Sequence, residues 1–121
     1  MTPLIRKLVL GIAGLALLVF SGISFYESRR LKEPVVVSDG VTQVVKLSKY
    51  FSGVEGTAND CNIYIFEGKE PGATFCILGG THPEEPAGRL AAWIFAENAL
   101  LQKGRLIVVL SANRSATTVT R

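Results

Sequence analysis

Histidine and cysteine are both scarce in this sequence. Its 121 residues include one histidine, His82, and two cysteines, Cys61 and Cys76. The spacing of the two cysteines matches no cysteine-based metal site, so we expect none. Cys76 lies within an apolar run and is most simply a small buried apolar residue.

A basic surface is also missing, although the net charge is +3. Residues 1–33 contain five basic and two acidic side chains, whereas residues 34–121 contain eight of each. The whole excess of positive charge therefore belongs to the first segment. Because nucleic-acid binding relies on a basic face, we expect no nucleic-acid partner.

Charged residues are absent from Leu8 to Tyr26, a nearly continuous apolar run of 19 residues. As a helix this run would be roughly 28 Å long, about the thickness of the hydrocarbon core of a bilayer. We therefore predict a membrane anchor that contacts the lipid bilayer through residues 8–26. Basic residues flank it on both sides, namely Arg6, Lys7, Arg29, Arg30 and Lys32.

Two alternatives to an anchor are a cleaved signal peptide and a helix buried in a soluble domain. Arg6 and Lys7 would suit the n-region of a signal peptide, but no Ala-x-Ala cleavage site follows, and the apolar run is long for an h-region. The short basic head favours a signal anchor with the N-terminus inside. We expect a single-pass membrane protein whose domain is extracytoplasmic.

The chain divides into a membrane anchor with basic flanks (1–33), a linker or edge-strand segment (34–60) and a partial α/β domain (61–121). Within the middle segment, residues 35–37 and 41–47 are short β-branched runs, separated by a turn signal. Residues 48–60 contain few apolar side chains and are predicted to form a loop.

Two strands are predicted at the start of the domain, over residues 62–67 and 74–79. The residues between them include Pro71-Gly72, a pair that turns favour. We expect the two strands to form a hairpin, with the second one buried on both faces because it lacks polar alternation. This pairing would set Cys76 opposite Ile65 and Cys61 beside Gly80, which disfavours a disulfide.

The pattern becomes helical over residues 87–103. Pro86 suits the first helical position, and Gly104 suits the position beyond the last turn. We expect the helix to pack through an apolar stripe of five residues, Ala87, Leu90, Ala91, Ile94 and Leu101. Trp93 and Phe95 are interpreted as packing residues rather than as a ligand platform.

A continuous apolar strand follows over residues 106–110, so strand, helix and strand form a βαβ unit. No further helix or strand is predicted after it. Parallel strands would bring the loop after Gly79 and the loop after Leu110 to one edge of the sheet. Ligand sites of open α/β sheets lie at that carboxyl edge.

The first of these loops, Gly79–Gly88, holds His82 and, three residues later, Glu85. Imidazole nitrogen and carboxylate oxygen are ligands that zinc favours, and each of these two residues precedes a proline that restricts it to an extended backbone. We therefore predict that His82 and Glu85 bind a metal ion. The alternatives are a solvated loop histidine and an acidic residue that stabilises the first turn of the helix.

This order of elements, with Gly-Gly-Thr-His-Pro-Glu-Glu-Pro-Ala-Gly before the helix and Ser-Ala-Asn-Arg-Ser-Ala after the last strand, resembles the succinylglutamate desuccinylase/aspartoacylase family. That family is related to the zinc carboxypeptidases, and the resemblance covers roughly residues 62–121. It implies the opening hairpin and βαβ unit of a zinc-carboxypeptidase-like three-layer fold. It also implies a Zn²⁺ cofactor held by His82 and Glu85.

The resemblance further implies hydrolysis of an amide or ester bond in a small acylated substrate that carries a carboxylate. Asn113 matches the asparagine that follows the corresponding strand of the family. Arg121, or alternatively Arg114, would match the arginine that binds the substrate carboxylate, a role that suits a bidentate guanidinium. A solvated loop charge is the other interpretation of such an arginine.

The family's third zinc ligand is a later histidine, and its general base is a distal glutamate. This sequence contains no second histidine, so no catalytic residue is assigned and little activity is expected from these residues alone. We interpret the chain as the N-terminal part of a membrane-anchored zinc hydrolase. The alternative is a non-catalytic, membrane-tethered interaction module. A phosphate-binding loop is disfavoured because no Gly-Lys-Ser/Thr follows Gly79-Gly80.

Overall fold

The computed structural model describes residues 2–28 and 34–119, which belong to two compact units. The first unit is helix α1, Pro3–Ser28. It is long enough and apolar enough to cross a membrane, and none of its residues is buried. The flanking residues Arg29, Arg30 and Lys32 lie outside the described part of the chain.

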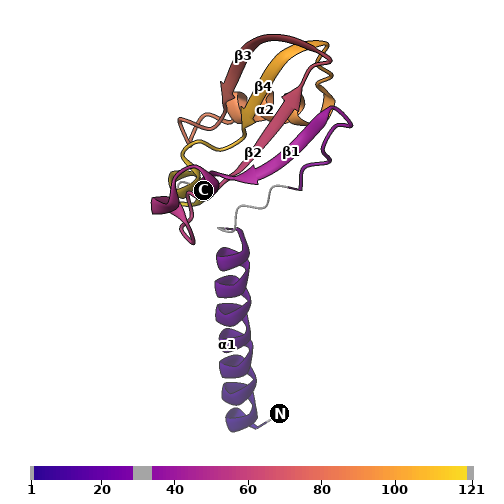
Figure 1. Cartoon of the computed structure of the whole chain (residues 1–121). Coiled ribbons are helices and arrows are strands. Elements are labelled where there is room, and N and C mark those ends of the chain that lie inside the picture. Colours follow the sequence, from indigo (N-terminus) through magenta and orange to yellow (C-terminus); the bar gives the residue numbers. More distant parts are fainter. Residues whose placement is uncertain (1, 29–33, 120–121) are drawn as a thin grey trace. The chain divides into compact units, whose positions relative to one another are not determined.

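The second unit is a mixed α/β domain built on a four-stranded sheet (Figure 1). The strand order is β1-β2-β4-β3. The first two neighbouring pairs are antiparallel, and β3 and β4 are parallel. The strands are β1 (Val41–Lys46), β2 (Asn62–Glu67), β3 (Glu70–Leu78) and β4 (Lys103–Val109).

The predicted βαβ unit is confirmed, since β3, helix α2 (Pro86–Asn98) and the parallel strand β4 follow one another. The predicted hairpin is wrong, because β4 lies between β2 and β3. The connection after β2 reverses the chain but passes across the start of β4, so β3 runs antiparallel to β2 without pairing with it. There the Gly68 amide donates to Gly104 O at 2.7 Å, and a Cβ on Gly68 would lie 2.5 Å from the Lys103 nitrogen.

Strand β3 is an edge strand, so the prediction that it is buried on both faces is also wrong. Phe75 is 67% exposed, and Cys76 is exposed rather than buried. The buried cysteine is Cys61, and it forms no disulfide with Cys76. A short apolar run does not distinguish a central strand from an edge strand, and β4 occupies the central place.

The main core lies between α2 and one face of the sheet. Side chains alternate along each strand, so Tyr64 and Phe66 of β2 face this core, whereas Ile63 and Ile65 belong to a smaller cluster on the opposite face. The buried members of the main core are Tyr64, Phe66, Ala92, Ala96, Leu106, Val108 and Leu110.

Helix α2 packs on the sheet through small residues, which corrects the predicted apolar stripe. Its buried residues are Ala92 and Ala96, whereas Leu90 and Ile94 are exposed. The alanines allow a close approach, because the contact includes Gly79, directly after β3, where a Cβ would lie 2.6 Å from Ala92 Cβ. Leu90 and Ile94 therefore point away from the sheet, whereas Leu101, which lies beyond the end of the helix, packs against the core.

The helix is also shorter than predicted, since it ends at Asn98. The Asn98 side chain donates from Nδ2 to Ile94 O at 2.9 Å, which binds a carbonyl in the last turn. Gly104 is not a helix cap but lies inside β4 with φ +77°. A Cβ there would collide with the Ala73 carbonyl oxygen of β3, so glycine permits this strand contact.

Residues 35–37 were predicted to be a linker or an edge strand, and no strand forms there. Instead residues 34–40 donate hydrogen bonds to α2 and the residue after it: Val36 N to Glu97 Oε1 at 3.1 Å, Ser38 N to Ala96 O at 3.1 Å and Ser38 Oγ to Ala99 O at 2.8 Å. Strand β1, which was predicted, follows and pairs with β2. The domain therefore begins with a segment laid along its helix.

Glu97 links this segment to the helix, because its Oε1 accepts from Trp93 Nε1 at 2.7 Å as well as from Val36 N. We expect Glu97→Ala to lower the free energy of unfolding by about 1–2 kcal/mol, because two donors lose a charged acceptor. Urea denaturation of the detergent-solubilised chain measures this loss. Glu97→Gln, which keeps one acceptor oxygen, should lose less. Equal stability of Glu97→Ala and the parent protein would contradict the proposed role.

A short helix, α3 (Arg114–Val119), occupies part of the segment where no element was predicted. Its first turn is capped from a distant loop, since Asn59 Oδ1 accepts from Ser115 N at 2.9 Å. The segment contains few apolar residues, and the capping residue lies 56 positions away in the chain. Asn113, directly before the helix, is a residue that N-caps favour, but the segment lacks the apolar periodicity by which a helix is predicted.

Candidate functional site

The site lies at the carboxyl edge of β3 and β4, as predicted from the βαβ unit. Two backbone hydrogen bonds tie the loop after β3 to the loop after β4: Ala112 N donates to Gly79 O at 2.8 Å, and Asn113 N donates to Gly80 O at 3.2 Å. The loop that carries His82 and the loop that carries Asn113 are therefore fixed to each other.

Two glycines allow this junction. A Cβ on Gly79 would lie 2.6 Å from Ala92 Cβ and 2.9 Å from the carbonyl oxygens of Gly88 and Leu110. Gly80 has φ +61°, a conformation that residues with side chains rarely adopt. The chain can therefore leave β3 sharply and enter α2 within a few residues.

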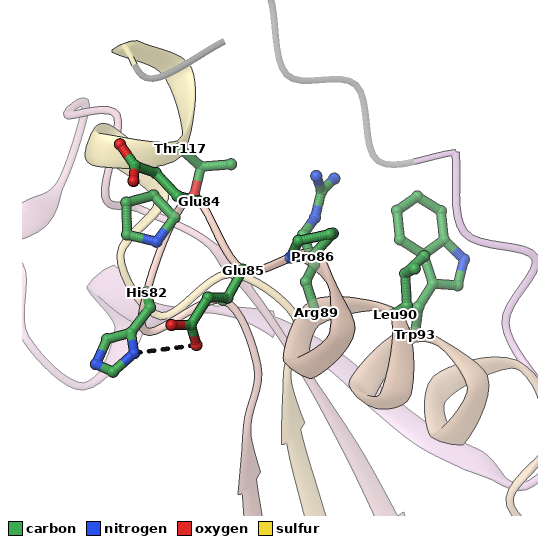
Figure 2. A pocket seen from close by; sticks show the side chains of 10 residues that line it. His82, Glu84, Glu85, Pro86, Arg89, Leu90, Trp93 and Thr117 are labelled. Atoms are coloured by element: carbon green, nitrogen blue, oxygen red, sulfur yellow. Dashed lines mark hydrogen bonds and ion pairs between the residues drawn. The ribbon is translucent and has the colours of Figure 1, made fainter.

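His82 and Glu85 face each other across this turn (Figure 2). His82 Nδ1 lies 3.3 Å from Glu85 Oε2, and the Glu85 amide donates to His82 O at 3.2 Å. Glu85 has the extended backbone expected before Pro86, with φ −105° and ψ 93°, and its side chain makes no capping hydrogen bond to α2. The carboxylate is thus directed to the imidazole rather than to the helix.

The spacing of these two atoms fits a zinc ion. Nitrogen and oxygen ligands lie about 2.0–2.1 Å from zinc in a tetrahedral site, so two of them stand about 3.3 Å apart. The measured Nδ1–Oε2 distance is 3.3 Å, and the two side chains are 73% and 75% exposed. A direct hydrogen bond between imidazole and carboxylate fits the same distance. The geometry therefore suits two ligands of an open site.

A third ligand is not apparent within residues 2–28 and 34–119, where no group of three or more His, Cys, Asp or Glu side chains could hold a metal. Glu84, the remaining acid of the loop, projects away from the His82–Glu85 pair in Figure 2. In the described part of the chain the pair is accordingly an incomplete ligand set.

A pocket of about 320 Å³ begins at this pair and continues along the first turns of α2. Arg89 and Trp93 line it, with the Arg89 guanidinium carbon 5.4 Å from the centre of the Trp93 ring, within the range of a cation–π contact. Thr117 of α3 contributes to the opposite wall. Trp93 is also partly buried against the main core, which confirms its predicted packing role. The i, i+4 spacing of Arg89 and Trp93 was the signal of their contact.

The predicted substrate-binding residues differ in where they lie. Asn113 is at the site edge, where its backbone carbonyl also accepts from Thr117 Oγ1 at 3.0 Å. Arg114 begins α3 and donates from Nη1 to Ala58 O at 3.3 Å, in the loop between β1 and β2. Arg121 lies outside the described residues. Arg89, which was not predicted, is the arginine that lines the pocket with His82 and Glu85.

No protein-family model, curated protein or solved structure matches this chain. What these residues can do is therefore inferred from their geometry and from the resemblance of the loop.

Proposed function

We propose that this chain carries part of a zinc-dependent hydrolase of the deacylase type, tethered to a membrane by α1 with its domain on the extracytoplasmic side. The observation that carries the proposal is the 3.3 Å separation of His82 Nδ1 and Glu85 Oε2 at the carboxyl edge of a βαβ unit. The sheet with α2 on one face would be the opening part of a zinc-carboxypeptidase-like three-layer fold.

His82 would supply a neutral imidazole nitrogen to the metal, and Glu85 would supply an anionic oxygen. When bound, zinc acts as a Lewis acid toward the amide or ester carbonyl of the substrate. The pocket beside the pair would hold the remainder of an acylated, carboxylate-bearing substrate. Asn113 is proposed as a substrate contact because its loop is hydrogen-bonded to Gly80. Arg121 is retained as a second contact on the resemblance alone.

The remaining ligand and the general base would come from groups that this sequence does not supply, because it contains a single histidine. The same observation favours a second candidate function, a non-catalytic, membrane-tethered interaction module in which the loop no longer binds metal. In that case the His82–Glu85 contact is only a hydrogen bond between two exposed side chains.

Equilibrium dialysis of the detergent-solubilised chain against zinc distinguishes these two functions. We expect one zinc ion per chain with a micromolar to millimolar dissociation constant, which corresponds to about −4 to −8 kcal/mol. His82→Ala and Glu85→Ala should each weaken binding about tenfold or more, because each removes one of two ligands.

Glu84→Ala is the matched control, since it removes a neighbouring carboxylate that does not contact His82. It should leave zinc binding unchanged. If zinc binds equally well without His82, or does not bind at all, the metal site is absent and the interaction module becomes the better assignment. Hydrolysis of N-acyl amino acids by zinc-loaded longer forms that supply the third ligand would then test the deacylase chemistry separately.

A further inference from the structure

Two large aromatic side chains stand exposed next to each other in the connection between β1 and β2. Tyr50 is 62% exposed and Phe51 is 61% exposed. Lys49 precedes them, and its Nζ lies 5.9 Å from the centre of the Tyr50 ring. We call residues 47–54 the aromatic loop. Its composition, with aromatic rings beside a long basic side chain, is typical of residues at a membrane–water interface.

The aromatic loop is held in place by hydrogen bonds and by Leu47, which packs against the smaller cluster of the sheet. It consists of two short 3₁₀ turns, Leu47–Lys49 and Ser52–Val54. The Asp60 carboxylate accepts from both Ser48 N at 2.9 Å and Ser48 Oγ at 3.0 Å. Phe51 lies over Gly53, where a Cβ would come within 2.7 Å of the ring. The exposed rings are therefore presented on an ordered backbone.

The chain itself supplies a reason for lipid to be the partner. Seven positions separate Ser28, the last residue of α1, from Val35, which packs against the domain core. Seven extended residues span at most about 25 Å, so a bilayer that held α1 would be within reach of the domain. Near the loop, Lys46 and Lys49 balance Glu55 and Asp60 in formal charge. The Asp60 carboxylate accepts from Ser48, and Lys46 Nζ donates to Asp60 O at 3.2 Å, so Lys49 is the lysine that the loop offers to lipid.

We propose that the aromatic loop docks on the surface of the bilayer that holds α1, with Tyr50 and Phe51 at the level of the lipid headgroups. The Lys49 side chain would extend toward the phosphate groups, as long basic side chains do at membrane interfaces. The rest of the connection between β1 and β2 is bonded to α3 through Ala58 and Asn59. Docking would accordingly turn the candidate site's edge of the sheet toward the lipid. This proposal does not depend on zinc.

Fluorescence quenching in nanodiscs tests the proposal with the full chain. Trp93 is the sole tryptophan, so Phe51→Trp adds one reporter to a known background. In phosphatidylcholine/phosphatidylglycerol nanodiscs, we expect brominated acyl chains to reduce the emission of the tryptophan introduced at position 51 about twofold. Bromine quenches only a tryptophan that lies close to it, and the interface is where the loop would place this ring. Phe75→Trp is the matched control, because Phe75 is equally exposed on β3, and its added emission should persist.

Equal quenching of both reporters would indicate non-specific contact with lipid and would overturn the proposal. So would the absence of quenching at position 51. If the Phe51→Trp emission shifts to shorter wavelength without quenching, and only in nanodiscs that hold two copies, the loop binds a second copy of the chain instead. Circular dichroism of each variant shows that the domain remains folded during the measurement.

Discussion

Phe66→Ala is expected to lower the free energy of unfolding of the domain by about 3–5 kcal/mol. Phe66 is the largest fully buried side chain, and it belongs to the core between the sheet and α2. Its partners in the sheet are Val41 on one side and Leu106 on the other. Truncation would therefore leave a cavity at the centre of the sheet. Domains of this size have a total stability of about 5–15 kcal/mol, so much of the variant would unfold at moderate temperature.

Urea denaturation monitored by Trp93 fluorescence, in detergent solution of the full chain, measures the Phe66→Ala effect. Phe75→Ala removes the same atoms from an exposed position on β3 and should cost less than about 1 kcal/mol. Similar losses for the two variants would mean that the buried face of the sheet has been assigned to the wrong side chains.

Gly79→Val is expected to cost about 3 kcal/mol, the upper part of the range for overpacking. The added side chain meets Ala92 Cβ at 2.6 Å and the carbonyl oxygens of Gly88 and Leu110 at 2.9 Å. Two of these three atoms belong to the backbone, which cannot move away as a flexible side chain could. Relief of the clash would separate α2 from the sheet, so we expect zinc binding by His82 to weaken in parallel with stability.

Gly88→Ala provides the comparison for Gly79→Val, because both glycines lie between the end of β3 and the first turn of α2. Nothing lies within 4 Å of a Cβ at Gly88, which is part of α2. This substitution should stabilise the domain by up to about 1 kcal/mol, since alanine favours the helix. Thermal unfolding of the two variants should shift in opposite directions. A Gly79→Val protein as stable as the parent would show that α2 does not pack as closely as described.

Local patterns in the sequence were sufficient to predict the elements around the site. The apolar run ending at Leu78, Pro86 at the helix start and the apolar run beginning at Leu106 together predicted a βαβ unit, which the parallel register of β3 and β4 confirms. Within that unit, proximity of His82 and Glu85 followed from a short turn between a strand and a helix. Whether the pair binds zinc stays a prediction.

The order of strands could not be read from the same patterns. Residues 75–78 and 106–110 are both short and apolar, yet the first run lies at the sheet edge and the second at its centre. Which run becomes central depends on pairing between distant residues, such as Ile63 with Val109. The buried face of α2 was missed for a related reason, because close packing on Gly79 selects small residues such as Ala92 over large ones.

The place of β4 between β2 and β3 also determines when the domain can form during synthesis. Strands β1 and β2 can pair as soon as both have been made, whereas β3 contacts only β4 in the sheet. Lys103, the first residue of β4, lies 25 positions after Leu78, the last residue of β3. At about 5–20 residues per second, a ribosome needs roughly 1–5 s to cover that distance. For that interval the nascent chain carries an apolar strand without its partner, which is when chaperone binding would matter most to this protein.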